Sequence, residues 1–168
     1  MPFIINIHGP IASGKTTTTK LLQKKFKNII YIDRPTLKKD LKLLGKEKAR
    51  KISSEASYFM LGQCINTKKN ILVSEMSPTK IVKHFKTQMN KYNYTLFSFF
   101  LDCSLPTSMK RVKIRSDIPS LDYLGKNYKK FSKPEKGDIV IDTEKLTPKE
   151  SLQFILQHVG SDHKNMLK

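Results

Sequence analysis

The sequence has few cysteines and no long apolar run, and these absences exclude several classes of protein. Only two cysteines, Cys64 and Cys103, occur among the 168 residues. Two are too few for a disulfide framework, and they form no metal-binding pattern. No stretch approaches the roughly 18 apolar residues of a membrane-spanning helix, and the first residues do not resemble a charged leader. We therefore expect a soluble, cytoplasmic protein with a single domain and no membrane partner.

Arginine is scarce as well, and acidic residues are few. Four of the 32 basic residues are arginines, and the 14 acidic residues leave a net charge of +18. Such an excess attracts polyanions, which makes nucleic acid a candidate partner, although the abundance of Lys, Ile and Asn is also typical of AT-rich coding. A guanidinium binds phosphate oxygens bidentately, so the few arginines are the stronger functional candidates. They are Arg34, Arg50, Arg111 and Arg115.

The most informative motif present is a complete G-x-x-x-x-G-K-[ST] pattern at residues 9–16. It follows the apolar run 3–7 and precedes helical sequence, which is the context of a phosphate-binding loop. Lys15 is expected to reach the β- and γ-phosphates and Thr16 to hold Mg²⁺, so ATP and Mg²⁺ are the predicted cofactors. No Asn-Lys-x-Asp guanine motif occurs. The predicted nucleotide-binding residues are Gly9, Ala12, Ser13, Gly14, Lys15, Thr16 and Thr17.

Short apolar runs alternate with helical patterns along the chain, which predicts an α/β fold. We expect one domain over residues 1–160, with a five-stranded, mostly parallel sheet and helices on both faces. A small lid is expected at about 111–130, and residues 161–168 are expected to be a frayed tail. The predicted strands are 3–7, 29–32, 70–73, 95–101 and 138–141.

Helices are expected between these strands. The first follows the phosphate loop to about residue 26, and another is indicated between 52 and 67, after Lys-rich and helical sequence from 36 onward. A third begins near Pro78, with Ile81, Val82 and Phe85 facing inward. A fourth spans 104–115, and Thr147 with Glu150 predicts a capping box for the last helix. The apolar positions that indicate the helix at 52–67 are Ile52, Ala56, Phe59, Met60 and Cys64.

Three acidic residues that follow predicted strands are candidates for the site, because ligands bind at the strand ends of open α/β sheets. Asp33 is the candidate general base, and Arg34 the candidate to hold an acceptor phosphate or orient the base; the alternative for Asp33 is a turn or helix cap. Glu75 is a candidate to position metal-bound water or to contact the acceptor, or else an exposed loop acid. Asp102 is expected to cap the next helix.

Arg111 and Arg115 stand four residues apart, so they share one helix face and can point to one anion. We predict that they stabilise the transferring phosphoryl group from a lid, with a solvated basic face as the alternative. The four histidines are not spaced as metal ligands would be, and we assign them no role.

Together the motif, the strand-end acids and the two arginines resemble the P-loop kinase superfamily over nearly the whole chain. The segments 71–78 and 100–115 are most similar to phage polynucleotide kinases and related DNA-modifying kinases, although here the order is Asp33-Arg34 where that family has Arg before Asp. The segment 137–148 resembles the corresponding segment of small-molecule kinases, where it lines the adenine pocket. This resemblance implies that residues 142–145 are candidates to contact the adenine.

The resulting hypothesis is an ATP-dependent kinase that transfers the γ-phosphoryl group to a hydroxyl of a nucleic acid, at a 5′ end or on a hydroxymethylated base. Lys15, Asp33, Arg111 and Arg115 are the predicted catalytic residues. A nucleoside, nucleotide or small-metabolite kinase remains the alternative within enzymes. A non-catalytic nucleotide-binding module is the alternative of another class.

Overall fold

The computed structural model describes residues 1–114, 124–125, 128–129 and 131–160. Arg115, most of the predicted lid and the predicted tail 161–168 lie outside the described residues. Within these ranges, no helix is both long enough and apolar enough to cross a membrane.

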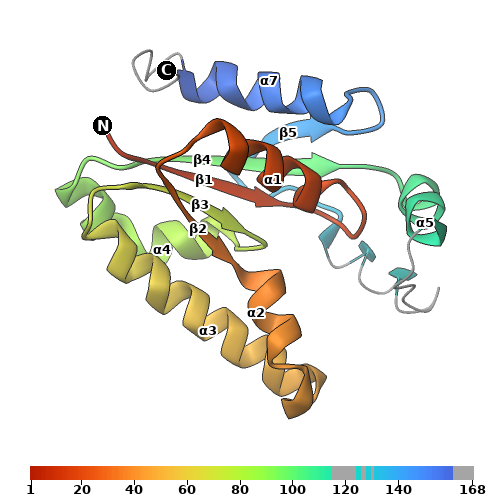
Figure 1. The fold of residues 1–168 in the computed structure, drawn as a ribbon, viewed down its shortest axis with the longest axis horizontal. Coiled ribbons are helices and arrows are strands. Elements are labelled where there is room, and N and C mark those ends of the chain that lie inside the picture. Colours follow the sequence, from red (N-terminus) through yellow and green to blue (C-terminus); the bar gives the residue numbers. More distant parts are fainter. Residues whose placement is uncertain (115–123, 126–127, 130, 161–168) are drawn as a thin grey trace.

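The centre of the molecule is a five-stranded sheet in which every pairing is parallel (Figure 1). The strand order is β2-β3-β1-β4-β5. This confirms the predicted α/β class and the number of strands. The strands are β1 (Phe3–His8), β2 (Ile29–Asp33), β3 (Asn70–Ser74), β4 (Thr95–Asp102) and β5 (Ile139–Asp142), each within one residue of its predicted bounds.

The register brings the carboxyl ends of the strands to one edge of the sheet. Asp33 of β2 lies opposite Ser74 of β3, which in turn lies opposite Ile7 of β1. On the other side of β1, Asp102 of β4 pairs with Asp142 of β5. The phosphate-loop motif and the strand-end acids therefore meet at the same edge, as expected for a parallel sheet.

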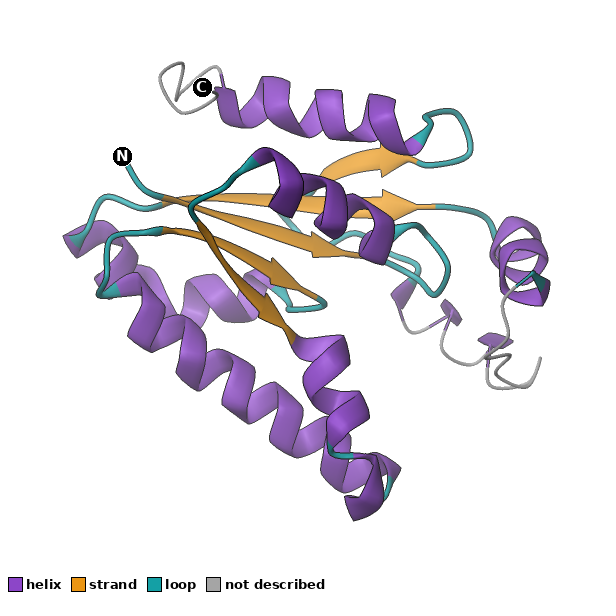
Figure 2. Cartoon of the chain, viewed as in Figure 1, coloured by secondary structure: helices purple, strands orange, loops and turns teal. Residues whose placement is uncertain are grey.

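Helices connect the strands and cover both faces of the sheet (Figure 2). The described helices are α1 (Lys15–Lys25), α2 (Arg34–Asp40), the 3₁₀ turn η1 (Lys42–Leu44), α3 (Lys46–Ile65), α4 (Pro78–Lys91), α5 (Leu105–Lys113) and α7 (Pro148–Gly160).

Two apolar cores lie on the two faces of the sheet, because the side chains of β1 alternate between them. Phe3, Ile5 and Ile7 pack with α1 and α7 on one face. Ile4 packs on the other face with residues of α3 and α4. The strand is almost continuously apolar since neither face meets water.

Helix α3 buries a different face from the one its apolar spacing suggests. Ser53 and Ser57 are buried, whereas Ile52 is 40% and Phe59 70% exposed. The serine hydroxyls donate to backbone oxygens of their own helix, at 3.1 Å to Arg50 and 2.7 Å to Ser53. Because these hydroxyls are satisfied locally, a row of small residues can face the protein interior.

The helix ends follow their sequence signals in most places. Thr147 and Glu150 form the predicted capping box, with Thr147 N donating to Glu150 Oε2 at 2.8 Å and Glu150 N to Thr147 Oγ1 at 3.3 Å. Ser77 caps α4 and Pro78 opens it. In α4 the prediction for Val82 is wrong, since its side chain is 42% exposed.

Candidate active site

The phosphate-loop motif connects β1 to α1 and is shaped by residues with positive φ. Gly9 has φ +141°, and a Cβ there would lie 2.3 Å from the carbonyl oxygen of Leu101. Ala12 has φ 58° and Gly14 φ 98°. Gly14 is the N-cap of α1 and supplies no side-chain cap to its first turn. This loop fits a phosphate group, because left-handed residues and an uncapped helix N-terminus direct N–H groups toward an anion.

A second feature of the loop is a buried hydroxyl. Ser13 is fully buried, and no described residue forms a hydrogen bond with its Oγ. A buried hydroxyl is normally satisfied, so an unpaired one in a phosphate loop is consistent with a ligand partner. Thr16 and Thr17 follow at the start of α1, both exposed.

Lys15 lies across the loop from which it projects. Its Nζ donates to the carbonyl oxygens of Gly9 at 3.1 Å and Pro10 at 2.7 Å. The same ammonium lies 3.5 Å from Oε1 of Glu75. The lysine of the motif and the acid after β3 are thus brought together, although 60 positions separate them in the chain.

Glu75 sits in a strained turn after β3. Its φ is +59°, a left-handed value that side chains other than glycine seldom adopt. The backbone is held by two hydrogen bonds, from Glu75 N to Ile7 O at 2.9 Å and from Arg34 Nη1 to Glu75 O at 2.8 Å. Strain that the surroundings maintain in this way is common at functional sites.

Asp33 occupies the mouth of the loop and also caps α2. Its carboxylate accepts from Thr36 N at 3.3 Å and from Thr36 Oγ1 at 2.6 Å. The helix-cap alternative for Asp33 is therefore a fact of the fold. Its neighbour Arg34 points to the Glu75 turn, and its Nε is buried with no hydrogen-bond acceptor among the described residues.

These groups surround one polar cavity of about 180 Å³. Asp33 and Glu75 line it, as do Lys15 and Thr16 of the phosphate loop, so the two candidate acids share one cavity with the candidate phosphate site. The lining residues are Ile11, Ala12, Gly14, Lys15, Thr16, Thr19, Tyr31, Asp33, Pro35, Thr36, Ser74 and Glu75.

Arg111 lies on the other side of the loop, against its backbone. Its Nη1 lies 3.3 Å from Ala12 O and 3.0 Å from Thr143 Oγ1, and Nη2 donates to Thr143 O at 2.6 Å. Ser108 of the same helix donates to Ile11 O at 2.7 Å. Helix α5 thus links the phosphate loop to the residues after β5.

The expected helix cap at Asp102 is wrong. The N-cap of α5 is Ser104, which accepts from Thr107 N. The backbone oxygen of Asp102 instead accepts from Thr143 N at 2.9 Å and from Thr143 Oγ1 at 2.8 Å. These bonds fix the start of the segment that the resemblance assigns to the adenine pocket.

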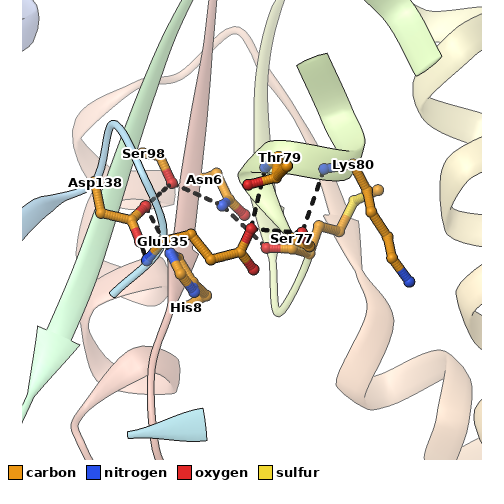
Figure 3. A network of polar contacts seen from close by, with 9 residues as sticks. Asn6, His8, Ser77, Thr79, Lys80, Ser98, Glu135 and Asp138 are labelled. Atoms are coloured by element: carbon orange, nitrogen blue, oxygen red, sulfur yellow. Dashed lines mark hydrogen bonds and ion pairs between the residues drawn. The ribbon is translucent and has the colours of Figure 1, made fainter. Parts of the chain in front are cut away.

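A polar network joins the end of β1 to the residue just before β5, and no sequence pattern indicates it (Figure 3). His8, which directly precedes Gly9, places Nε2 2.8 Å from Oδ1 of Asp138, whose side chain is fully buried. Ser98 also donates to Asp138, at 2.7 Å. Burial raises the pKa of Asp138, but the hydrogen bonds from His8, Ser98 and the Glu135 backbone outweigh it, so the pKa is lowered.

A metal ion would need partners besides protein carboxylates. Among the residues that the structure describes, no three His, Cys, Asp or Glu side chains cluster closely enough to hold one. Mg²⁺ in a nucleotide site is commonly bound through phosphate oxygens, water and one or two side chains, so Thr16 and Glu75 are compatible with that mode.

No protein-family model matches the chain, and no curated protein matches it in sequence. Solved structures do match. A provisionally named kinase from Chloroflexus aurantiacus superposes with a TM-score of 0.74 at 15% identity, over 95% of this chain and 97% of that chain. A gluconokinase from Sinorhizobium meliloti superposes with a TM-score of 0.68 at 16% identity, over 98% of this chain and 95% of that chain. A deoxyadenosine kinase from M.mycoides superposes with a TM-score of 0.59 at 22% identity, over 94% of this chain and 99% of that chain.

All three likenesses lie below 25% identity, so they establish the fold. The chain has the fold of the P-loop kinases, with a single α/β domain and an all-parallel sheet. None of the three is named as a polynucleotide kinase, and the narrower resemblance to that group stays a prediction.

Proposed function

We propose that the protein is an ATP-dependent kinase that transfers the γ-phosphoryl group to a hydroxyl. The observation that carries this proposal is the shared cavity, in which Lys15 and Thr16 of the phosphate loop face the carboxylates of Asp33 and Glu75. Phosphoryl transfer requires cations at the phosphates and a carboxylate near the acceptor, and this cavity supplies both kinds of group.

In the proposed mechanism, the loop N–H groups and Lys15 bind the phosphates of ATP. Lys15 exchanges its present contacts with Gly9 O and Pro10 O for phosphate oxygens. The Thr16 hydroxyl would help to hold Mg²⁺, which would supply positive charge to offset that of the phosphates. Asp33 accepts the proton of the acceptor hydroxyl while the hydroxyl oxygen bonds to the γ-phosphorus of ATP. The bond between the γ-phosphorus and the oxygen that bridges to the β-phosphate breaks, which releases ADP.

Arg111 is proposed to act on the nucleotide side of the site. Its contacts with Ala12 O and both oxygens of Thr143 favour a clamp that holds the phosphate loop against the residues after β5. Stabilisation of the transferring group by Arg111 and Arg115 remains a prediction. A loss of kcat in Arg111→Lys at unchanged ATP affinity supports that role, whereas weakened ATP affinity supports the clamp.

For the acceptor we propose a nucleic acid, on the strength of a basic arm formed by residues 34–51. These 18 residues contain eight basic and two acidic side chains, so they carry +6 of the net charge of +18. Figure 1 shows α2 and the beginning of α3 extending away from the sheet beyond the end of β2. Such an arm beside the cavity can contact several phosphates of one strand.

A small acceptor is the second candidate. The cavity of about 180 Å³ suits a small molecule, and the similar folds include proteins named gluconokinase and deoxyadenosine kinase. Under this alternative the acceptor reaches Asp33 without touching the arm, and the arm's charge reflects coding composition.

The test is transfer from γ-labelled ATP with Mg²⁺ to a panel of acceptors: 5′-hydroxyl DNA and RNA, DNA with hydroxymethylpyrimidines, nucleosides, nucleoside monophosphates and gluconate. Label on a polynucleotide supports the nucleic-acid acceptor, and label on a small acceptor alone contradicts it. Binding of ATP with no transfer to any of these contradicts the kinase and leaves a nucleotide-binding module.

Charge reversal separates the two acceptors further. Lys39→Glu with Lys42→Glu changes the exposed arm, and Lys24→Glu with Lys149→Glu makes the same change in exposed positions of α1 and α7. A polynucleotide acceptor predicts a higher KM and a shallower salt dependence for the arm variant alone. Equal behaviour of the two variants supports a small acceptor.

A further inference from the structure

Glu135 lies just before β5 and contacts the beginning of α4, far away in the sequence (Figure 3). Its Oε2 accepts from Ser77 Oγ at 2.8 Å and from Thr79 N at 3.2 Å. Thr79 N is one of the first-turn N–H groups of α4, which have no partner within the helix. Burial raises the pKa of Glu135, but the hydrogen bonds from Thr79 and Ser77 outweigh it and lower the pKa.

The backbone of Glu135 is itself firmly anchored. Glu135 N donates to Asp138 Oδ2 at 2.6 Å, and Asp138 N donates to Glu135 O at 3.1 Å. Asp138 is held in turn by His8 of β1 and Ser98 of β4. Glu135 is thus a fixed point attached to two central strands of the sheet, from which its carboxylate reaches Ser77.

On the other side of this contact is the strained turn of residues 75–77. Besides the bonds to Ile7 and Arg34 described above, Asn6 Nδ2 donates to Met76 O at 3.1 Å. A left-handed φ at Glu75 persists only when its surroundings determine it, and here the turn is held from β1, from α2 and from the segment before β5.

We propose that Glu135 is a positioning residue for Glu75: through Ser77, it holds the 75–77 turn in the conformation that directs the Glu75 carboxylate toward Lys15 and the phosphate loop. This inference rests on the proposed function. It extends the active site to a carboxylate that does not line the cavity, and to a segment more than 50 residues from the turn it controls.

A purely structural role for Glu135, as a partner of the α4 N-terminus, is the competing explanation. The two roles differ in their coupling to Glu75. If Glu135 acts through Glu75, then Glu135→Ala lowers kcat in the presence of Glu75 and changes little once Glu75 is Gln. If Glu135 only stabilises α4, the two substitutions act independently and their effects on kcat multiply.

The experiment is a double-mutant cycle with Glu75→Gln and Glu135→Ala, read out as kcat and as Kd for Mg·ATP. We expect Glu135→Ala to lower kcat by about tenfold to a hundredfold, the range that small misplacement of a catalytic group produces. Its Kd should change less than threefold, and the double variant should match Glu75→Gln. Glu135→Gln retains an acceptor oxygen for Ser77 and Thr79, so it should restore most of the activity.

Glu150 supplies the matched control, since it too is a carboxylate that accepts at a helix N-terminus, on α7. Glu150→Ala should lower stability and leave kcat unchanged, alone or with Glu75→Gln. If Glu135→Ala does not fold, Ser77→Ala takes its place in the cycle, because it removes the hydroxyl that joins Glu135 to the turn.

The outcomes separate this inference from the proposed function. Multiplicative effects, or a Glu135→Gln variant as impaired as Glu135→Ala, overturn the positioning role while phosphoryl transfer by the wild type stands. A wild-type protein that neither binds Mg·ATP nor transfers phosphate overturns both.

Discussion

Arg34 Nη1 donates a hydrogen bond of 2.8 Å to the backbone oxygen of Glu75, which joins the first residue of α2 to the turn after β3. Asp33 directly precedes Arg34, so this bond links the two residues that carry the candidate carboxylates of the cavity. The bond spans 41 positions of sequence and connects the ends of two adjacent strands.

Arg34→Ala should therefore impair both stability and transfer. A hydrogen bond from a charged donor contributes about 1.5–3 kcal/mol, and its loss also leaves the Glu75 oxygen without this donor. Arg34→Lys keeps the charge without the planar fork, so we expect it to recover part of the stability and little of the activity. Urea unfolding and kcat, measured on both variants, check this; a fully active Arg34→Lys would contradict the geometric role.

Asp33→Asn separates the two roles of that side chain. Asn caps helices about as well as Asp, so the free energy of unfolding should change by less than about 0.5 kcal/mol. Transfer should fall by about 10²–10⁴, because the amide cannot accept the acceptor proton. Asp33→Ala should lose transfer activity in the same way, and its free energy of unfolding should also fall by about 1 kcal/mol because alanine cannot cap the helix. Wild-type turnover by folded Asp33→Asn would remove Asp33 as the base.

Lys15→Ala should lower transfer by at least about a hundredfold, the usual cost of removing one positioned cation or donor from a transition state. Lys20→Ala is the matched control, since Lys20 is exposed on the same helix. The far-UV circular dichroism of both variants should match the wild type. Equal turnover in the two would show that the loop lysine takes no part in transfer.

The sheet and the phosphate loop are predictable from the sequence because their signals are local. Each parallel strand is a short apolar run bounded by polar residues, and the glycine pattern at 9–16 dictates the turn that follows β1. Helix α3 shows the limit of such patterns. Its buried face contains Ser53 and Ser57, whose hydroxyls are satisfied within the helix, and apolar spacing does not detect a face of that kind.

The supports of the site were not predictable for a different reason. His8 has no ligand spacing with other histidines, and Asp138 appears in the sequence only as the start of a strand. The fold brings them to 2.8 Å across 130 positions. Likewise, nothing near Glu75 in the sequence indicates that Arg34 and Asn6 hold its turn. Such contacts depend on strand order, which a single sequence does not determine.

Gly9→Ala should destabilise the protein more than Gly45→Ala. Both positions have positive φ, at +141° and +82°, so alanine is strained at each by about 1–3 kcal/mol. At Gly9, however, the new Cβ would lie 2.3 Å from Leu101 O, whereas nothing lies within 4 Å at Gly45. Urea midpoints of the two variants give the comparison. Equal losses would mean that the loop can shift away from β4.

The buried Asp138 should make stability fall in acid. Its pKa lies below the ordinary value of 3.8, so the native state favours the ionised carboxylate. The stabilisation is complete above the unfolded-state pKa and is lost as the pH falls from about 4 through the lower native pKa.

Asp138→Asn removes this titration. The Asn side chain has one acceptor oxygen where the carboxylate has two, so its NH₂ group would face another donor, either Glu135 N or the Ser98 hydroxyl. The variant should therefore be less stable than the wild type at pH 6, and the difference should shrink below about pH 4. Glu135, Glu144 and Glu150, whose pKa values are also lowered, titrate in both proteins and largely cancel in the difference. Urea unfolding from pH 3 to 6 measures it, with exposed Asp40→Asn as the control for charge. A difference that is independent of pH would show that the His8–Asp138 contact does not hold the carboxylate ionised.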